Sequence, residues 1–238
     1  METLSTLKQD LNKLKNSERA KQCMRYFKTA KGEYGEGDIF IGLTSSEQKE
    51  IAKKYLDLCF GDIQKLLDSE IHEERQISLI ILRKNFEKTR DEKKRKNIFS
   101  LYLKNAHKGN INNWDLVDCS TPTIIGGFLI DKDREILYKL AKSKNLWEKR
   151  ISVLATFAFI RENDFKDSLK IAEILLNDKH DLIHKAVGWM LREIGKRNQD
   201  KEEKFLKKHY KKMPRTMLRY AIERFDEKKR KDYLNSKI

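Results

Sequence analysis

The sequence predicts an all-α fold, an α-solenoid in which antiparallel helix pairs stack one after another. The 238 residues include only 2 prolines and 10 glycines, too few for the turns that many β-strands would need. Apolar residues recur at helical spacing along most of the chain, in segments joined by connectors of a few residues. Short connectors make neighbouring helices antiparallel, and stacked helix pairs form a solenoid.

The first part of the chain predicts three helices and a loop rich in glycine. The first helix covers residues 3–16 and carries four leucines at helical spacing, and a second runs through Met24 and Phe27. Residues 32–43, GEYGEGDIFIGL, hold four of the ten glycines, which predicts a structured loop without a phosphate-binding GxxxxGK motif. A third helix is expected over residues 47–59.

From residue 60 onward, helical segments alternate with short polar connectors. The period is close to 40 residues, as in HEAT-type repeats, although no consensus repeat is visible and a compact irregular bundle is the alternative. Pro122 predicts a helix break, with the next helix capped by neighbouring hydroxyl groups. The predicted helices cover residues 60–69, 73–87, 91–107, 112–119, 122–130, 132–142, 146–161, 165–177, 181–197, 201–211 and 214–225.

The charge balance favours an anionic partner. Lys and Arg number 52 against 37 Asp and Glu, a formal net charge of +15, which favours nucleic acid before a membrane surface. Lysine-rich surfaces also occur in proteins without such a partner. No apolar run approaches the ~20 residues of a membrane span, and the N-terminus lacks the apolar core of a signal peptide. We expect one cytoplasmic domain over residues 1–238, a monomer with no membrane partner.

The cysteines and histidines do not predict a metal or redox site. Cys23, Cys59 and Cys119 are odd in number and lack the spacing of metal ligands or of a CxxC motif. His180 and His184 are four residues apart, but no third ligand is near them in sequence. We therefore expect no metal and no cofactor.

Residues 184–198, HKAVGWMLREIGKRN, combine a buried stripe with an unusual outer face. Trp189 lies roughly 110° from the centre of the apolar stripe, at about 100° per residue, and Arg192 lies nearly opposite that centre. Lys185 and Lys196 are close to Arg192 on the helix surface. An indole beside three cations favours a polyanionic, partly flat ligand. The alternative is that a neighbouring helix covers Trp189 and that the cations face solvent.

Three residues recur at about one repeat length. Trp114, Arg150 and Trp189 are separated by 36 and 39 residues, so equivalent positions on successive helix pairs would place them on one concave wall. Trp114 and Asp118 are at i and i+4 and share a helical face. Arg150 flanks the apolar side of its helix, where an unpaired cation is costly. Its partner is either an anionic ligand or a carboxylate of the protein, and the sequence leaves both open.

Five segments of the chain carry a family resemblance: GEYGEGDIFIGL, NNWDLVDCSTPTIIGGFL, LWEKRISVLATFAFI, HKAVGWMLREIGKRN and MPRTMLRYAIERF. They resemble the DNA alkylation repair enzymes of the AlkD type, the HEAT-like-repeat DNA glycosylases, over roughly residues 20–225. The resemblance implies a right-handed solenoid whose concave, basic groove holds duplex DNA containing alkylated purines. It also implies hydrolysis of the N-glycosidic bond of positively charged N3- or N7-alkylated purines, such as 3-methyladenine and 7-methylguanine.

The resemblance also implies roles for individual residues. Trp114 and Asp118 stand at the family's catalytic Trp and Asp, and Trp189 stands at its second cleft Trp. Arg150 matches the Arg that contacts DNA near the lesion, and Arg192 matches the Arg beside the second Trp. The family's N-terminal aromatic residue falls among three candidates that the sequence does not separate: Tyr26, Phe27 and Tyr34. Further expected DNA contacts are Lys185, Lys196 and Arg219.

The chemistry can be argued from the residues themselves. Cleavage of a glycosidic bond develops positive charge on the sugar, which the Asp118 carboxylate can stabilise while it orients or deprotonates water. Indole faces attract a cation by about 0.5–2 kcal/mol, so Trp114 and Trp189 would favour charged lesions. The alternative for Asp118 is a surface carboxylate paired with a nearby cation. The alternative for the protein is a non-catalytic HEAT-repeat module that binds DNA or an acidic protein.

Overall fold

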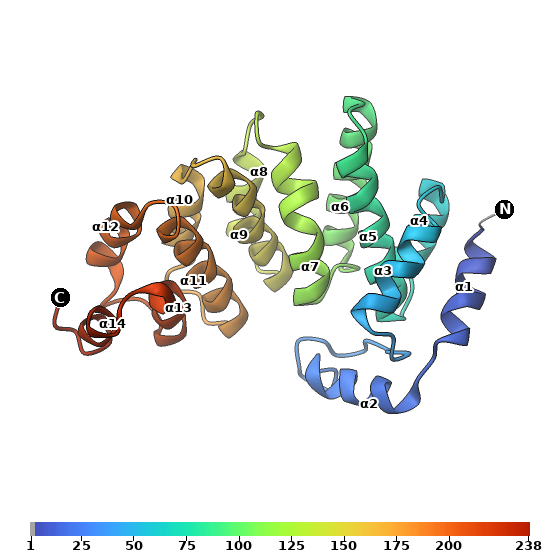
Figure 1. The fold of residues 1–238 in the computed structure, drawn as a ribbon, viewed down its shortest axis with the longest axis horizontal. Coiled ribbons are helices and arrows are strands. Elements are labelled where there is room, and N and C mark those ends of the chain that lie inside the picture. Colours follow the sequence, from blue (N-terminus) through green and yellow to red (C-terminus); the bar gives the residue numbers. More distant parts are fainter. Residues whose placement is uncertain (1–2) are drawn as a thin grey trace. The chain divides into compact units, whose positions relative to one another are not determined.

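The computed structural model describes residues 3–238, which fold into α-helices joined by short loops (Figure 1). These residues form no β-strand, only an isolated parallel bridge between Ile39 and Ile71, so the predicted all-α class is confirmed. None of their helices has the length and apolar character needed to cross a membrane. The chain divides into two compact units, one ending at Ser120 and one starting at Thr121. The single domain over residues 1–238 stays a prediction.

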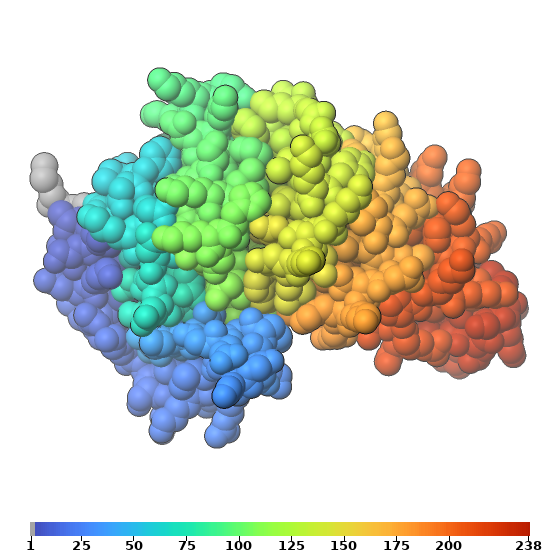
Figure 2. Space-filling view, turned by 180° about the vertical axis from the view of Figure 1, so that it is seen from behind, coloured from blue at the N-terminus to red at the C-terminus, as the bar shows by residue number. Residues whose placement is uncertain are grey.

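The N-terminal unit is built from helices α1–α7. Helix α3 packs against α5, and α5 packs against both α4 and α6. Helix α2 and the loop after it project from the body of this unit, coloured blue in Figure 2. The helices are α1 (Leu4–Lys13), α2 (Ser17–Tyr26), α3 (Ser45–Lys54), α4 (Phe60–Leu67), α5 (His72–Lys88), α6 (Glu92–Lys108) and α7 (Trp114–Thr121).

The C-terminal unit repeats this pattern. Helix α11 packs against α9, α12 and α13, and α9 also packs against α8 and α10. Both units are therefore stacks of helix pairs, consistent with an α-solenoid. The helices are the π-helix η1 (Pro122–Gly126), α8 (Glu135–Ala141), α9 (Leu146–Arg161), α10 (Lys166–Ile174), α11 (Asp181–Gly195), α12 (Gln199–His209), α13 (Arg215–Ala221), the 3₁₀-helix η2 (Ile222–Arg224) and α14 (Glu227–Leu234).

Helix α11 has the buried stripe that its sequence predicts. Its stripe residues are buried, except that Leu182 is half-buried. Gly188 is needed for packing, because a Cβ there would lie only 2.5 Å from the carbonyl oxygen of Met217 in α13. The glycine thus allows α13 to approach the backbone of α11. The buried residues are Ile183, Ala186, Val187, Gly188, Met190, Leu191 and Ile194.

Several predictions about helix limits are wrong, including the end of α3, the break at Pro122 and the cap after it. Helix α3 ends at Lys54 rather than at residue 59, because Tyr55 leaves the helical conformation and its N–H bonds back to the carbonyl of Ala52. The chain does not break at Pro122 but continues as the π-helix η1, whose wider turn accommodates the proline ring. Ser120 donates to the carbonyl of Leu116 (2.5 Å) instead of capping a new helix.

Helix α14 was not predicted from the sequence, because its apolar signal is weak. Tyr233 is its buried residue. Its start is fixed by Asp226, whose side chain accepts a hydrogen bond from the backbone N–H of Lys229 (2.9 Å).

Candidate functional site

The glycine-rich loop is held against the start of α5. Ile39 exchanges two backbone hydrogen bonds with this segment, from its own N–H to Glu70 (3.2 Å) and from the N–H of His72 to its carbonyl (2.8 Å). The Glu73 carboxylate accepts from three consecutive N–H groups at the end of the loop, at 2.8–3.3 Å. One of these belongs to Gly42, whose φ of +85° favours glycine. The loop is therefore a fixed platform.

A buried polar network joins this loop to α7. The two ring nitrogens of His72 each lie 2.9 Å from a carboxylate, Nδ1 from Asp38 and Nε2 from Asp115. Asp38 also accepts from Arg75 (2.6 Å) and from the side-chain amide of Asn113 (3.3 Å). Burial lowers the pKa of His72, but the two carboxylates outweigh it and raise the pKa to about 9. His72 is thus an imidazolium at neutral pH.

An aromatic stack supports Trp114 on the same side. The Phe27 ring lies parallel to the indole of Trp114, with centroids 5.2 Å apart, and parallel to Phe40 at 5.0 Å. The Tyr26 ring meets Trp114 edge-on at 5.8 Å and is 66% exposed. Tyr26 and Phe27, two of the three aromatic candidates, therefore both contact Trp114. Tyr26 is the more open to a ligand.

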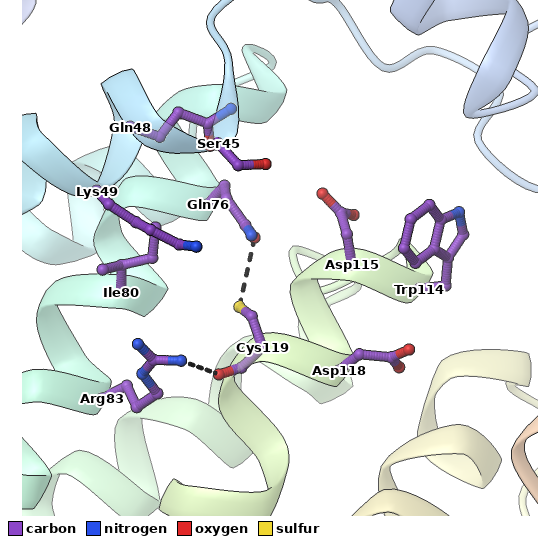
Figure 3. Close-up of a pocket in the computed structure, with 10 residues that line it drawn as sticks. All are labelled: Ser45, Gln48, Lys49, Gln76, Ile80, Arg83, Trp114, Asp115, Asp118 and Cys119. Carbon is purple, nitrogen blue, oxygen red and sulfur yellow. Dashed lines mark hydrogen bonds between the residues drawn. The ribbon is translucent and has the colours of Figure 1, made fainter. Parts of the chain in front are cut away.

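Trp114 and Asp118 line the same pocket of the N-terminal unit. The pocket has a volume of about 300 Å³. Figure 3 shows both side chains projecting from one side of α7, as the i, i+4 spacing predicts. Both are half-buried, so part of each side chain is accessible. The lining residues are Ser45, Gln48, Lys49, Gln76, Ile80, Arg83, Trp114, Asp115, Asp118 and Cys119.

The sequence did not predict the other side of this pocket. Gln76 and Arg83 lie on α5, and Arg83 donates to the backbone carbonyl of Cys119 (3.1 Å). The sequence did not single out these two residues because α5 is buried around most of its circumference. Its sequence therefore lacks a single polar face. Burial raises the pKa of the Cys119 thiol to about 12, which keeps it a neutral thiol and makes it a poor nucleophile at neutral pH.

The remaining predicted site residues lie in the C-terminal unit. Arg150 on α9 is buried (5% exposed) and donates to the backbone carbonyl of Leu182 (2.6 Å). Trp189 on α11 is half-buried, with its ring 5.9 Å from that of Phe157 on α9. Its indole N–H donates to Glu193 (3.1 Å). That Trp189 and Arg150 line one wall with Trp114 stays a prediction.

The predicted cationic DNA contacts of the C-terminal unit differ in pairing. Arg192 pairs with Glu223 of η2, and its other terminal nitrogen is 3.6 Å from Glu193. Lys196 is 2.6 Å from the same Glu193. Lys185 pairs with Asp181 at 2.6 Å. Arg219 on α13 is exposed. The outer face of α11 therefore alternates cations with carboxylates.

The comparisons with known proteins identify the family. Residues 7–225 match the family described as DNA alkylation repair enzyme. The chain belongs to the DNA alkylation repair enzyme family. It is also similar to a solved structure described as a predicted DNA alkylation repair enzyme from Enterococcus faecalis, with a TM-score of 0.68 and 16% sequence identity. That match covers 90% of this chain and 97% of the other, and at this identity it shows a shared fold. No curated protein matches the sequence.

Metal ligands do not cluster in this member of the DNA alkylation repair family. Within residues 3–238, no group of three or more His, Cys, Asp and Glu side chains could hold a metal ion. Cys23, Cys59 and Cys119 are all free thiols.

Proposed function

We propose that this protein is a monofunctional DNA glycosylase of base excision repair, which hydrolyses the N-glycosidic bond of positively charged N3- or N7-alkylated purines in duplex DNA. The observation that carries the proposal is the shared pocket of Trp114 and Asp118 in a chain of the DNA alkylation repair family. A carboxylate and an indole on one open face are the groups that this reaction needs.

Asp118 supplies the negative charge. As the bond between C1′ and the purine nitrogen breaks, its electron pair stays with the base, and positive charge develops on the deoxyribose. The Asp118 carboxylate stabilises that charge and orients the water that adds to C1′, and the proton lost by the water passes to the carboxylate or to solvent. Asp118 is half-buried in its pocket, so its field is screened less than that of a fully exposed carboxylate.

Trp114 and Trp189 supply selectivity for a charged lesion. The face of an indole attracts a cation by about 0.5–2 kcal/mol, and the Phe27 stack and the Tyr26 edge fix the orientation of Trp114. Alkylation at N3 or N7 makes the purine a cation that leaves as a neutral base, so a strong general acid is not required. A neutral, unmodified purine lacks both advantages.

The cations of the C-terminal unit hold the DNA. The net charge of +15 favours association with a polyanion. In this proposal Arg150 contacts DNA near the lesion and Arg192 contacts DNA beside Trp189. The backbone contacts come from Lys185, Lys196 and Arg219. The enzyme acts as a monomer in the cytoplasm and is associated with the nucleoid when it is bound to DNA.

The decisive experiment is incubation of the purified protein with methylated genomic DNA, followed by chromatography of the freed bases. We expect 3-methyladenine and 7-methylguanine in the supernatant. Asp118→Asn should abolish release while DNA affinity stays within about twofold, because the amide keeps the shape and loses the charge. The control is Asp57→Asn, which changes an exposed carboxylate on the connector between α3 and α4. It should leave release unchanged.

Two outcomes would contradict the proposal in different ways. Release that persists in Asp118→Asn would show that the catalytic residue is assigned wrongly. Salt-sensitive DNA binding without base release under any alkylating treatment would instead favour the non-catalytic DNA-binding module.

A further inference from the structure

We propose that His72 is a positioning residue for this site. In its protonated form it ties the glycine-rich loop to the first turn of α7 and thereby fixes the indole of Trp114. The catalytic consequence rests on the proposed glycosylase function, whereas the structural coupling between His72 and Trp114 does not.

The first connection is polar and direct. The side chain of His72 is 2% exposed, and its Nε2 lies 2.9 Å from Oδ2 of Asp115, the residue after Trp114. The other oxygen of Asp115 accepts from the backbone N–H of Leu116 (2.9 Å). His72 therefore holds the first turn of α7 through a carboxylate that is fixed at both oxygens.

The second connection passes through Asp38 and the residue before α7. Nδ1 of His72 lies 2.9 Å from Asp38, and the same carboxylate oxygen accepts from the side-chain amide of Asn113 (3.3 Å). The side-chain oxygen of Asn113 in turn accepts from the backbone N–H of Trp114 (2.9 Å). Because this path ends on the backbone of Trp114, a change at His72 moves the indole and its helix end together.

The third connection is the aromatic stack. The ring of His72 stacks on Phe40 with centroids 4.4 Å apart and an interplanar angle of 22°. Phe40 stacks on Phe27, and Phe27 stacks on Trp114. A cationic ring against an aromatic face is attractive. The ring of His72 also contacts Phe27 directly, with centroids 5.2 Å apart and an interplanar angle of 36°. His72, Phe40 and Phe27 therefore form a cluster of three rings, which reaches Trp114 through Phe27.

The network requires the imidazolium. A neutral imidazole carries one N–H and one lone pair, so it could donate to only one of the two carboxylates and would turn a lone pair toward the other. Asp38 approaches from the loop and Asp115 from α7, and Arg75 on α5 neutralises part of their charge at 2.6 Å from Asp38. From α2, Cys23 faces the same region with its thiol pKa raised by burial, so it remains neutral.

Fluorine NMR of the protein labelled with 5-fluorotryptophan tests the coupling without using activity. Each of the 3 tryptophans gives one signal, and Trp114→Phe assigns that of Trp114. We expect its shift to titrate with a midpoint near pH 9, the pKa of His72, while the signals of Trp147 and Trp189 stay flat. The measurement is made in Tyr26→Phe protein, because the ring of Tyr26 contacts Trp114 and this substitution removes its hydroxyl group.

Two variants make this test specific. In His72→Gln the Trp114 titration should vanish. In Asp115→Asn the hydrogen bond can be kept but one charge is lost, so the midpoint should move to lower pH. His107→Gln, which changes an exposed histidine on α6, is the matched control. Its Trp114 signal should titrate as it does in the parent Tyr26→Phe protein. If His72→Gln fails to fold, Asp115→Asn alone decides. A flat Trp114 signal in the parent protein, or an unchanged midpoint in Asp115→Asn, would overturn the proposal.

Single-turnover base release then tests the catalytic consequence. His72→Gln should slow release on the order of 10²-fold, the size expected for a displaced catalytic group, with DNA affinity unchanged within about twofold. The slowing should appear in the maximal rate rather than in the DNA concentration for half-saturation. A normal rate in this variant would overturn the positioning role. If the wild type releases no base but the Trp114 titration is present, the glycosylase proposal fails and the coupling of His72 to Trp114 stands.

Discussion

The network around His72 in the N-terminal unit and the outer face of α11 in the C-terminal unit hold their charged groups in opposite ways. In the N-terminal unit, Asp38, His72 and Arg75 are all at most 5% exposed and bond to one another. On the outer face of α11, Arg192 and Lys196 lie near the surface, where Arg192 pairs with Glu223 of η2 and Lys196 pairs with Glu193 one turn away. Buried ion pairs are costly to break, whereas surface pairs contribute about 0–1 kcal/mol.

This difference matches two tasks. A group that stabilises developing charge must be held in place before the substrate arrives, and the buried network beside Trp114 does this. A group that binds a phosphate must exchange its carboxylate partner for the ligand, which is easy when the pair is weak and hydrated. The N-terminal unit is thus preorganised, and the outer face of α11 is exchangeable.

The largest expected effect comes from breaking the preorganised side. Asp38→Ala removes the carboxylate that faces both His72 and Arg75 and leaves two cations buried. We expect the free energy of unfolding to fall by about 3–5 kcal/mol, measured by urea denaturation. Glu50→Ala, which breaks an exposed pair with Lys53 (2.6 Å) in the same unit, is the control and should have a much smaller effect. Equal effects of the two changes would show that burying an ion pair does not change what it contributes to stability.

A pH effect should sharpen the comparison, because the C-terminal unit also buries acids, among them Glu202. Glu202 on α12 packs against Gly195 at the end of α11. Burial, followed by the charge of Glu203, raises the pKa of Glu202 from 4.5 to about 8. The folded chain therefore keeps a proton that the unfolded chain releases. This stabilisation is complete below pH 4.5 and is lost as the pH rises through about 8.

Glu202→Gln should remove that loss. At pH 9 we expect the variant to exceed the wild type in free energy of unfolding by several kcal/mol, since each pKa unit of the shift corresponds to about 1.4 kcal/mol. The difference should be much smaller at pH 5, and urea denaturation at both pH values measures it. His72, whose pKa is raised from 6.5 to about 9, contributes stability that is complete below pH 6.5 and lost as the pH rises through 9. The stability that the N-terminal unit loses when His72 gives up its proton should therefore still be lost in Glu202→Gln. If Glu202→Gln is no more stable than the wild type at pH 9, Glu202 does not have the raised pKa that this prediction assumes.

Much of the fold was predictable because local patterns decide it. The buried stripe of α11 is confirmed, since apolar spacing alone determines which face of a helix packs inward. The shared helical face of Trp114 and Asp118 on α7 was equally predictable, and the two residues line one pocket. Helix α14 was missed because its limits depend on a capping aspartate and one buried tyrosine rather than on a stripe.

The polar network around His72 could not be predicted from the sequence. Its members come from a loop, from α5 and from α7, and nothing in their spacing says that a bridge between Ile39 and Ile71 brings Asp38 beside His72. Contacts of this kind are set by tertiary packing, which one sequence does not encode in a readable period. The same holds for Tyr26, whose contact with Trp114 depends on the path of the loop.

A smaller effect is expected from removing one exchangeable cation. Arg192→Ala should weaken DNA binding about five- to tenfold and reduce the slope of log affinity against log salt by about 1, because one phosphate contact is lost. Fluorescence anisotropy with a labelled duplex at several salt concentrations measures both. Arg90→Ala, which changes an exposed arginine between α5 and α6, is the control. An unchanged salt slope in Arg192→Ala would show that Arg192 does not contact phosphate.

The smallest expected effect has the opposite sign. Glu223 pairs with Arg192 and competes with phosphate for its guanidinium, so Glu223→Gln should tighten DNA binding by about two- to fivefold, the size of a weak surface ion pair. The gain should disappear when Arg192→Ala is combined with Glu223→Gln, since the two residues then share no interaction. Glu227→Gln, which frees Lys231 on α14 from its partner at 2.7 Å, removes the same charge and serves as the control. Equal tightening by both Glu→Gln changes would mean that net charge, and not an exchangeable Arg192, sets the affinity of this face.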